Sequence, residues 1–186
     1  MTSPLTGKNI LLGVSAGIAA YKAADLASKI NGAGAKVVTI LTENTTRLIG
    51  PKTFEAVTAN LVATDMWQLN SADHITHINL ADEADIVVVA PATADIIAKA
   101  ALGICDDLLS TTLCACWQKP VLFAPAMNER MWLNPAVQRN VEQLKDGGFH
   151  IMGPETGKLA CGTSGIGRMS EPARILEALE QIASKL

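Results

Sequence analysis

The sequence predicts an α/β fold in which helices cover both faces of a parallel sheet. Three observations support this prediction. Short apolar runs alternate with helical segments along the 186 residues, each run is continuous, and turn residues separate the segments. With 49% hydrophobic residues the chain can bury a large core, and its length suits a single domain over residues 1–186.

The first half of the chain shows this alternation clearly. Residues 9–14 (NILLGV) form a continuous apolar run and predict the first strand. The helix expected over 18–30 should end at the asparagine and glycines that follow it. A second strand is expected over 36–41 (KVVTIL), and Pro51 suits the first turn of a helix over 51–59.

The alternation continues to the end of the chain. DIVVVAP (85–91) and PVLFAPA (120–126) predict the third and fourth strands because apolar residues fill them. A fifth strand is expected over 149–153. Further helices are expected over 94–102, 106–117, 135–146 and 171–186, the last with an amphipathic pattern. The complete pattern is that of a Rossmann-like parallel sheet with helices on both faces.

Composition and charge exclude several classes of protein. No apolar run approaches the roughly 20 residues of a membrane span, and the first residues lack the pattern of a signal peptide. The net charge of −3, without a Lys/Arg cluster, gives no reason to expect nucleic acid. We therefore expect a cytoplasmic protein with neither membrane nor nucleic-acid partners.

The four cysteines are expected to be reduced thiols because no export signal is found. Together with three histidines they match no zinc spacing, so no metal is expected. Cys105, Cys114 and Cys116 are interpreted as small core residues. Cys161 differs, because the glycines around it in KLACGTSGIGRM (158–169) indicate a loop that presents the thiol.

Candidate ligand-binding residues follow the predicted strands. In a parallel sheet of this kind, ligands bind at the carboxyl ends of the strands. The sequence places SAG after the first strand, TEN after the second, PATAD after the third and PAMN after the fourth. The glycine-rich loop follows the fifth strand, so all five segments should meet at one edge.

The segment GVSAGIA (13–19) is a tight turn that leads into a helix. Ser15 stands where a dinucleotide fingerprint has glycine, and no lysine follows as in a P-loop. Two interpretations remain open: an ordinary strand-to-helix turn, or a site for a mononucleotide phosphate held by hydroxyls and backbone N–H groups. Under the second interpretation, Thr42 adds a hydroxyl at the end of the next strand.

Three further residues also have two interpretations each. Thr93 and Asn128 can simply cap the helices that follow them, or they can contact a ligand. The Asn128 amide suits a carboxylate. His77, just before the third strand, is either a surface residue or a functional base.

Together these residues resemble the flavin-dependent cysteine decarboxylase family. The motifs SAGIAAYK, HINLADEAD, APATADIIAK, DDLLST, APAMNERMW and ACGTSGIGRM occur in the family's order and span residues 15 to about 170. The resemblance implies a flavoprotein-type fold with FMN, assembled as a homotrimer or dodecamer. It also implies decarboxylation of 4′-phosphopantothenoylcysteine to 4′-phosphopantetheine in coenzyme A biosynthesis, through thiol oxidation, CO2 loss and re-reduction. A phosphopantothenate–cysteine ligase, fused or separate, is an expected partner.

The resemblance also implies roles for individual residues. His77 would act as a base or orient the substrate, Asn128 would hold the substrate carboxylate, and Cys161 would donate the last proton. The FMN-binding residues would be Ser15, Gly17, Ile18, Thr42, Pro91, Ala92, Thr93 and Asp95. The substrate would contact Met127, Asn128, Arg168 and Met169. Ala16 departs from the family, which usually has Gly or Ser there.

Three other functions remain as alternatives. Two of them also involve a bound flavin, and the third is nucleotide binding without a defined reaction. A flavin prenyltransferase-like enzyme shares the fold but does not need PAMN or the Cys161 loop. A flavin-binding subunit that regulates a phosphatase would tolerate the loss of His77 or Cys161, and both are present. A generic nucleotide-binding module leaves the ordered motifs unexplained.

Overall fold

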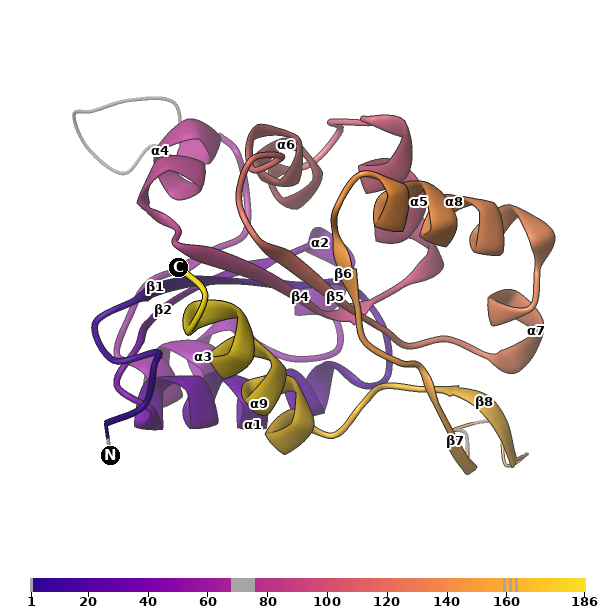
Figure 1. Cartoon of the computed structure of the whole chain (residues 1–186), viewed down its shortest axis with the longest axis horizontal. Helices are drawn as coiled ribbons and strands as arrows, with labels where there is room; N and C mark the ends of the chain where they lie inside the picture. The colour runs from indigo at the N-terminus through magenta and orange to yellow at the C-terminus, as the bar shows by residue number, and fades with distance from the viewer. Residues whose placement is uncertain (1, 68–75, 159, 161, 163) are drawn as a thin grey trace.

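A six-stranded parallel sheet forms the centre of the molecule (Figure 1). The computed structural model describes residues 2–67, 76–158, 160, 162 and 164–186. The strand order is β3-β2-β1-β4-β5-β6, which confirms the predicted fold class. The strands are β1 (Asn9–Val14), β2 (Lys36–Leu41), β3 (Val62–Ala63), β4 (Ile86–Ala92), β5 (Val121–Pro125) and β6 (His150–Ile151).

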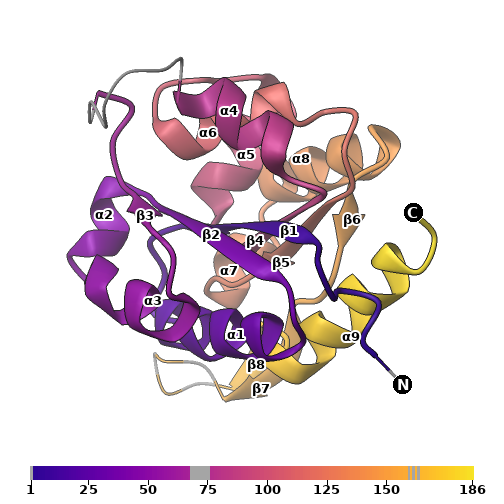
Figure 2. The same ribbon diagram turned by 90° about the vertical axis from the view of Figure 1, so that its left-hand side faces the viewer.

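Helices cover both faces of this sheet (Figure 2). One face carries α1 (Ala20–Gly32), α3 (Pro51–Thr58) and α9 (Pro172–Ala183). The other carries α4 (Thr76–Glu83), α5 (Ala94–Leu102), α6 (Leu108–Ala115) and α8 (Pro135–Asp146). Two short helices, α2 (Glu43–Thr46) and α7 (Glu129–Trp132), follow β2 and β5.

The two-sided cover explains the continuous apolar strands. Side chains of a strand alternate between the two faces of a sheet. In β1, Ile10 and Leu12 belong to the core on the α1 side, whereas Leu11 belongs to the core on the α5 side. In β4, Val88 and Val89 are divided in the same way. Helices cover both faces, so nearly every position of a central strand is apolar, and Thr39 in β2 is a buried polar exception.

The glycine-rich segment is an antiparallel hairpin, and the prediction of a loop is wrong for its two arms. The arms are β7 (Glu155–Lys158) and β8 (Ser164–Arg168), which form a separate two-stranded sheet. Gly165 and Gly167 are buried because the hairpin packs directly on residues 127–129. Cys161, between the arms, lies outside the described residues.

Other differences from the sequence prediction concern helix starts and cysteines. α6 begins at Leu108 because Asp107 caps it, with the Asp107 side chain accepting from Ser110 N–H at 2.7 Å. Cys116 is buried as expected, but Cys105 and Cys114 are exposed, so their assignment to the core is wrong. Cys105 lies in the loop before α6, and Cys114 lies on the exposed side of that helix.

The helices described by the structure include none that is both long enough and apolar enough to cross a membrane.

Candidate functional site

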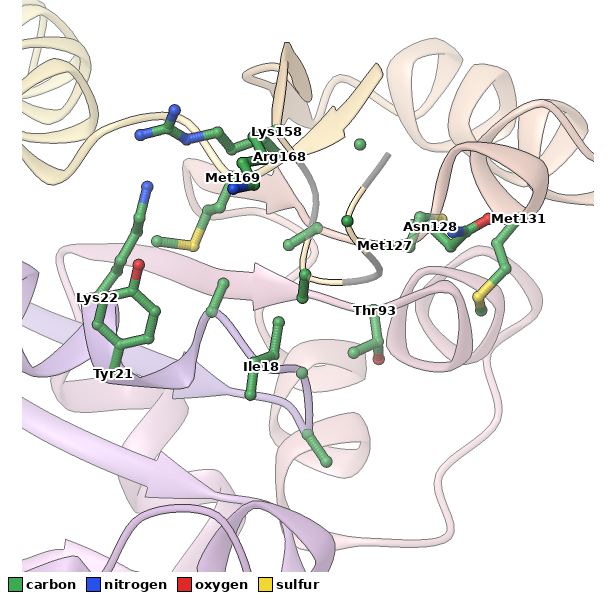
Figure 3. Close-up of a pocket in the computed structure, with 17 residues that line it drawn as sticks. Ile18, Tyr21, Lys22, Thr93, Met127, Asn128, Met131, Lys158, Arg168 and Met169 are labelled. Atoms are coloured by element: carbon green, nitrogen blue, oxygen red, sulfur yellow. The ribbon is translucent and has the colours of Figure 1, made fainter. Parts of the chain in front are cut away.

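A pocket of about 700 Å³ opens at the carboxyl edge of the sheet (Figure 3). Its volume lies within the range of small-molecule sites. The walls come from the turn after β1 and the start of α1, from Thr93 after β4, from residues 126–128 after β5, and from the hairpin. Four of the five segments expected to meet at this edge therefore line one pocket, whereas Thr42, in the segment after β2, does not.

Ser15 lies behind the pocket and connects two of these walls, the turn after β1 and the residues at the end of β4. Its hydroxyl is buried, donates a hydrogen bond to the Pro91 carbonyl at 2.8 Å, and accepts one from Thr93 N–H at 3.0 Å. Gly17 packs on the same two residues, because an added Cβ would lie 3.6 Å from Pro91 and from Thr93. Gly17 and Thr93 line the pocket, while Ser15 and Pro91 hold them together.

The start of α1 favours an anion. The N-cap residue is Ala19, and no described side chain caps this helix or places an acidic group in its first turn. Backbone N–H groups at a helix start carry partial positive charge. Ala16, Gly17, Ile18 and Ala19 line the pocket, so this helix start faces it. The geometry suits the phosphate interpretation of the turn.

Thr93 and Asn128 both cap the helices that follow them, and their contact with a ligand stays a prediction. Thr93 caps α5 by accepting from Ile96 N–H at 3.5 Å, and Asn128 caps α7 by accepting from Arg130 N–H at 2.9 Å. Both also line the pocket. Capping holds each side chain beside the pocket, which is compatible with the predicted contact.

Basic groups gather at one side of the pocket. Lys22 and Arg168 lie there, opposite Asn128 and Met131 (Figure 3). The Lys22 side chain is only 10% exposed and its ammonium lies 3.0 Å from Glu171 Oε1. Arg168 pairs with the same carboxylate. The hydrogen bond from Lys22 and the two positive charges hold the pKa of Glu171 below its ordinary value despite some desolvation.

Sequence reasoning missed Tyr21 and Lys22, although both line the pocket. They belong to the SAGIAAYK motif, and their sequence pattern alone predicts only that they lie in a helix. The signal that could identify them is their position in the helix. Side chains in the first turn of a helix lie close to the sheet edge at which that helix begins.

Several predicted residues lie elsewhere. Thr42 lines a second pocket of about 400 Å³ beside Asp65 and Asp107, and its hydroxyl lies 2.8 Å from that of Thr45. Ala92 is buried in the sheet, and Asp95 is exposed and pairs with Lys99 at 3.2 Å. His77 lies in the first turn of α4, outside the lining of both pockets.

The remaining expectations concern metals. Within the described ranges, no three His, Cys, Asp or Glu side chains gather in a way that would hold a metal ion. Lys99 instead forms an ion-pair network with Asp95, Asp106 and Asp107. Burial alone would lower the pKa of Lys99, but these carboxylates outweigh it and raise the pKa.

The chain is similar to part of known bifunctional proteins. It is 47% identical over 177 residues to the coenzyme A biosynthesis bifunctional protein CoaBC of Bacillus subtilis, covering 95% of this chain and 43% of that protein. It is 45% identical over 168 residues to CoaBC of Mycobacterium tuberculosis, covering 90% and 40%. The chain thus spans less than half the length of these curated relatives.

Solved structures share both fold and extent with this chain. A mutant PPC decarboxylase complexed with pantothenoylaminoethenethiol matches with a TM-score of 0.87 and 30% identity, over 96% of this chain and 99% of that one. The FMN-dependent cysteine decarboxylase SpaF matches with a TM-score of 0.81 and 34% identity, over 97% and 99%. A model of the family described as Flavoprotein matches residues 1–184. The chain belongs to the Flavoprotein family, which confirms the resemblance drawn from its motifs.

Proposed function

We propose that the protein catalyses the FMN-dependent decarboxylation of 4′-phosphopantothenoylcysteine to 4′-phosphopantetheine in coenzyme A biosynthesis. The observation that carries this proposal is one pocket that combines an anion-binding helix start, Thr93, Asn128 and a basic side. Support comes from CoaBC relatives of 44–47% identity and from the PPC decarboxylase match. The protein acts in the cytoplasm.

The residues of the pocket fit FMN. The start of α1 offers backbone N–H groups to its phosphate, and Thr93 offers a hydroxyl. Ile18, Met127 and Met131 offer apolar surface to its ring system. Gly17, Ile18 and Thr93 hold the cofactor directly, and Ser15 and Pro91 keep that wall in place. The resemblance also implies Thr42, Ala92 and Asp95, which lie outside the lining of this pocket.

The protein's own residues orient the substrate and move protons. When bound, FMN supplies reversible two-electron oxidation, which makes the bond to the carboxylate labile. Asn128 hydrogen-bonds the substrate carboxylate through its amide, and Met127, Arg168 and Met169 complete the contacts. His77 acts as a base or orients the substrate, and Cys161 donates the final proton.

We also propose a homotrimer, or a dodecamer built from trimers. Large apolar side chains at the pocket are exposed in the single chain, with Ile18 at 69% and Tyr21 at 64% exposure. His77 lies outside the pocket lining, so a neighbouring subunit is the proposed source of this residue. A phosphopantothenate–cysteine ligase, fused or separate, supplies the substrate.

The test is a comparison of two thiol substrates. Purified protein with FMN is incubated with phosphopantothenoylcysteine and, in parallel, with a peptide ending in cysteine. Mass spectrometry should show phosphopantetheine from the first and little change in the second. Turnover of the peptide alone would assign the protein to peptide modification. FMN binding with neither product would favour the regulatory-subunit or prenyltransferase alternatives.

A further inference from the structure

The β7–β8 hairpin depends on anchors outside itself. An isolated two-stranded hairpin is marginally stable in water. β7 and β8 pair with each other but with no strand of the six-stranded sheet, as far as the described residues show. The hairpin nevertheless contributes Lys158, Gly167 and Arg168 to the pocket wall. Whatever fixes β8 therefore also fixes that wall.

The segment after β5 supplies two anchors, one on each side of Asn128. Met127 N–H donates to the Gly167 carbonyl at 3.0 Å. Glu129 Oε1 accepts from Ile166 N–H at 3.1 Å. The first bond uses backbone atoms on both sides. The second bond needs a side chain with an acceptor atom, so it depends on which residue stands at position 129.

Two glycines make this close approach possible. A Cβ added to Gly165 would lie 2.5 Å from Glu129 Oε1, which is closer than any real contact. A Cβ added to Gly167, whose φ is +151°, would lie 2.1 Å from the Met127 carbonyl oxygen. A side chain at position 167 would collide with backbone, and one at position 165 would displace the Glu129 carboxylate. The two segments are thus built to be in direct contact.

The Glu129 carboxylate is well suited to hold a backbone amide. It is half-buried, and hydrogen bonds to a charged acceptor are stronger than those between neutral groups. Its backbone lies in the first turn of α7, directly after the N-cap Asn128. The side chain leaves that turn to reach β8 instead of pointing into solvent.

We propose that Glu129 is a positioning residue that fixes β8, and with it one wall of the pocket, relative to Asn128. This rests on the proposed function, in which Asn128 holds the substrate carboxylate. A displacement of about 1 Å at a reacting centre can cost on the order of 100-fold in rate. Glu129 touches β8, and its effect on the reaction passes through the position of that strand.

The experiment compares Glu129→Ala with Glu129→Gln in the FMN-loaded protein. Glutamine keeps an oxygen acceptor, whereas alanine removes it. Glu142→Ala is the control, because Glu142 lies on α8 and its 62%-exposed side chain pairs with Lys145. Hydrogen–deuterium exchange over residues 164–168 reports on β8, and steady-state decarboxylation reports on kcat and KM.

We expect Glu129→Ala to exchange the Ile166 amide faster and to lose roughly 10- to 100-fold in kcat, with the Kd for FMN unchanged. Glu129→Gln should stay within about fivefold of the parent protein, because one hydrogen bond weakens without being lost. The control should match the parent in both measurements.

Two results would overturn the proposal. Unchanged exchange in Glu129→Ala would show that Glu129 does not hold β8. Faster exchange with an unchanged kcat would show that β8 is held but that its position does not matter. A parent protein without decarboxylase activity contradicts the proposed function and the catalytic part of this inference. The exchange data then still decide whether Glu129 holds the strand.

Discussion

Single hydroxyl and carboxylate groups join the walls of the pocket to one another. Ser15 ties the turn after β1 to the turn after β4, and Glu129 ties the segment after β5 to the hairpin. Ser15 is buried and Glu129 is half-buried, and each is bonded to the backbone, so it sets the distance between two segments far apart in sequence. Pocket geometry therefore depends on residues that need not contact the ligand.

Replacing Ser15 tests this role directly. In Ser15→Ala, Thr93 N–H loses its acceptor, and the Pro91 carbonyl keeps the longer bond from Ser15 N–H at 3.3 Å. A buried donor without a partner costs about 1–3 kcal/mol of stability. Denaturant unfolding should show that loss, with weaker FMN binding.

A matched control for this change is Ser184→Ala, because the Ser184 hydroxyl is exposed and donates to the Gln181 carbonyl at 2.9 Å. Its stability should change by less than about 0.5 kcal/mol. If both variants lose the same amount, the buried bridge at Ser15 has no special importance.

The three described cysteines should differ in reactivity. Burial raises the pKa of Cys116 to about 11, so its thiol stays protonated at pH 8 and reacts slowly. Cys105 and Cys114 are exposed, and iodoacetamide should modify them first. Tandem mass spectrometry of peptide 100–119 separates the three sites. Equal labelling rates would contradict the burial of Cys116.

At the level of elements, an ion-pair group links α1, β8 and α9. Lys22 on α1 and Arg168 on β8 both contact Glu171, the N-cap residue of α9. Their positive charges lower the pKa of Glu171 in the folded protein. The carboxylate form is thus favoured by folding, so this contribution is present above the ordinary pKa of 4.5 and is lost as pH falls through the lower folded value.

Glu171→Gln should therefore destabilise the protein at pH 7 and matter less in acid. Because the Glu171 side chain is 42% exposed, the loss at pH 7 should be no more than about 1 kcal/mol. Thermal unfolding of parent and variant at pH 7 and below pH 4 measures the difference. A gap that widens on acidification would refute this role.

The same elements show how far sequence reasoning reaches. The central strands are predictable because burial on both faces demands continuous apolar runs, as in Ile86–Ala92. The hairpin is not predictable in this way. Its glycines at 165 and 167 are needed because residues 127–129, almost 40 residues earlier in the chain, pack directly against them. Glycine density alone does not distinguish a free loop from a strand packed against another backbone.

The candidate site also contains residues that the sequence predicts and residues that it does not. Gly17, Thr93 and Asn128 are predictable because they directly follow predicted strands, and the structure places all three in the pocket lining. Lys22 and Glu129 are not predictable, because their contacts depend on the direction of a side chain within a helix and on its partners in space. His77 was proposed from family resemblance, and no local pattern indicates which pocket it serves.

At the level of the whole molecule, the proposed trimer gives an expected mass. Light scattering of the FMN-loaded protein should report three times the chain mass of 19.6 kDa, or a multiple of that value. The apolar side chains exposed at the pocket, Ile18 and Tyr21, would be covered in such an assembly. A monomer that binds FMN and turns over normally would contradict the proposal.

Subunit mixing tests whether the site is shared between chains. His77→Asn and Asn128→Asp should each retain FMN but lose decarboxylation, since the first removes a proton-transfer group and the second places like charges together. His77 lies outside the pocket that Asn128 lines in one chain. If neighbouring subunits each supply one of the two residues, trimers refolded from a mixture will contain some sites with both native residues, and activity will return in part. Mixing each variant with itself is the control. Mixed trimers that stay inactive would place both residues in a site within one subunit, and the exposed surface around the pocket would then need another explanation.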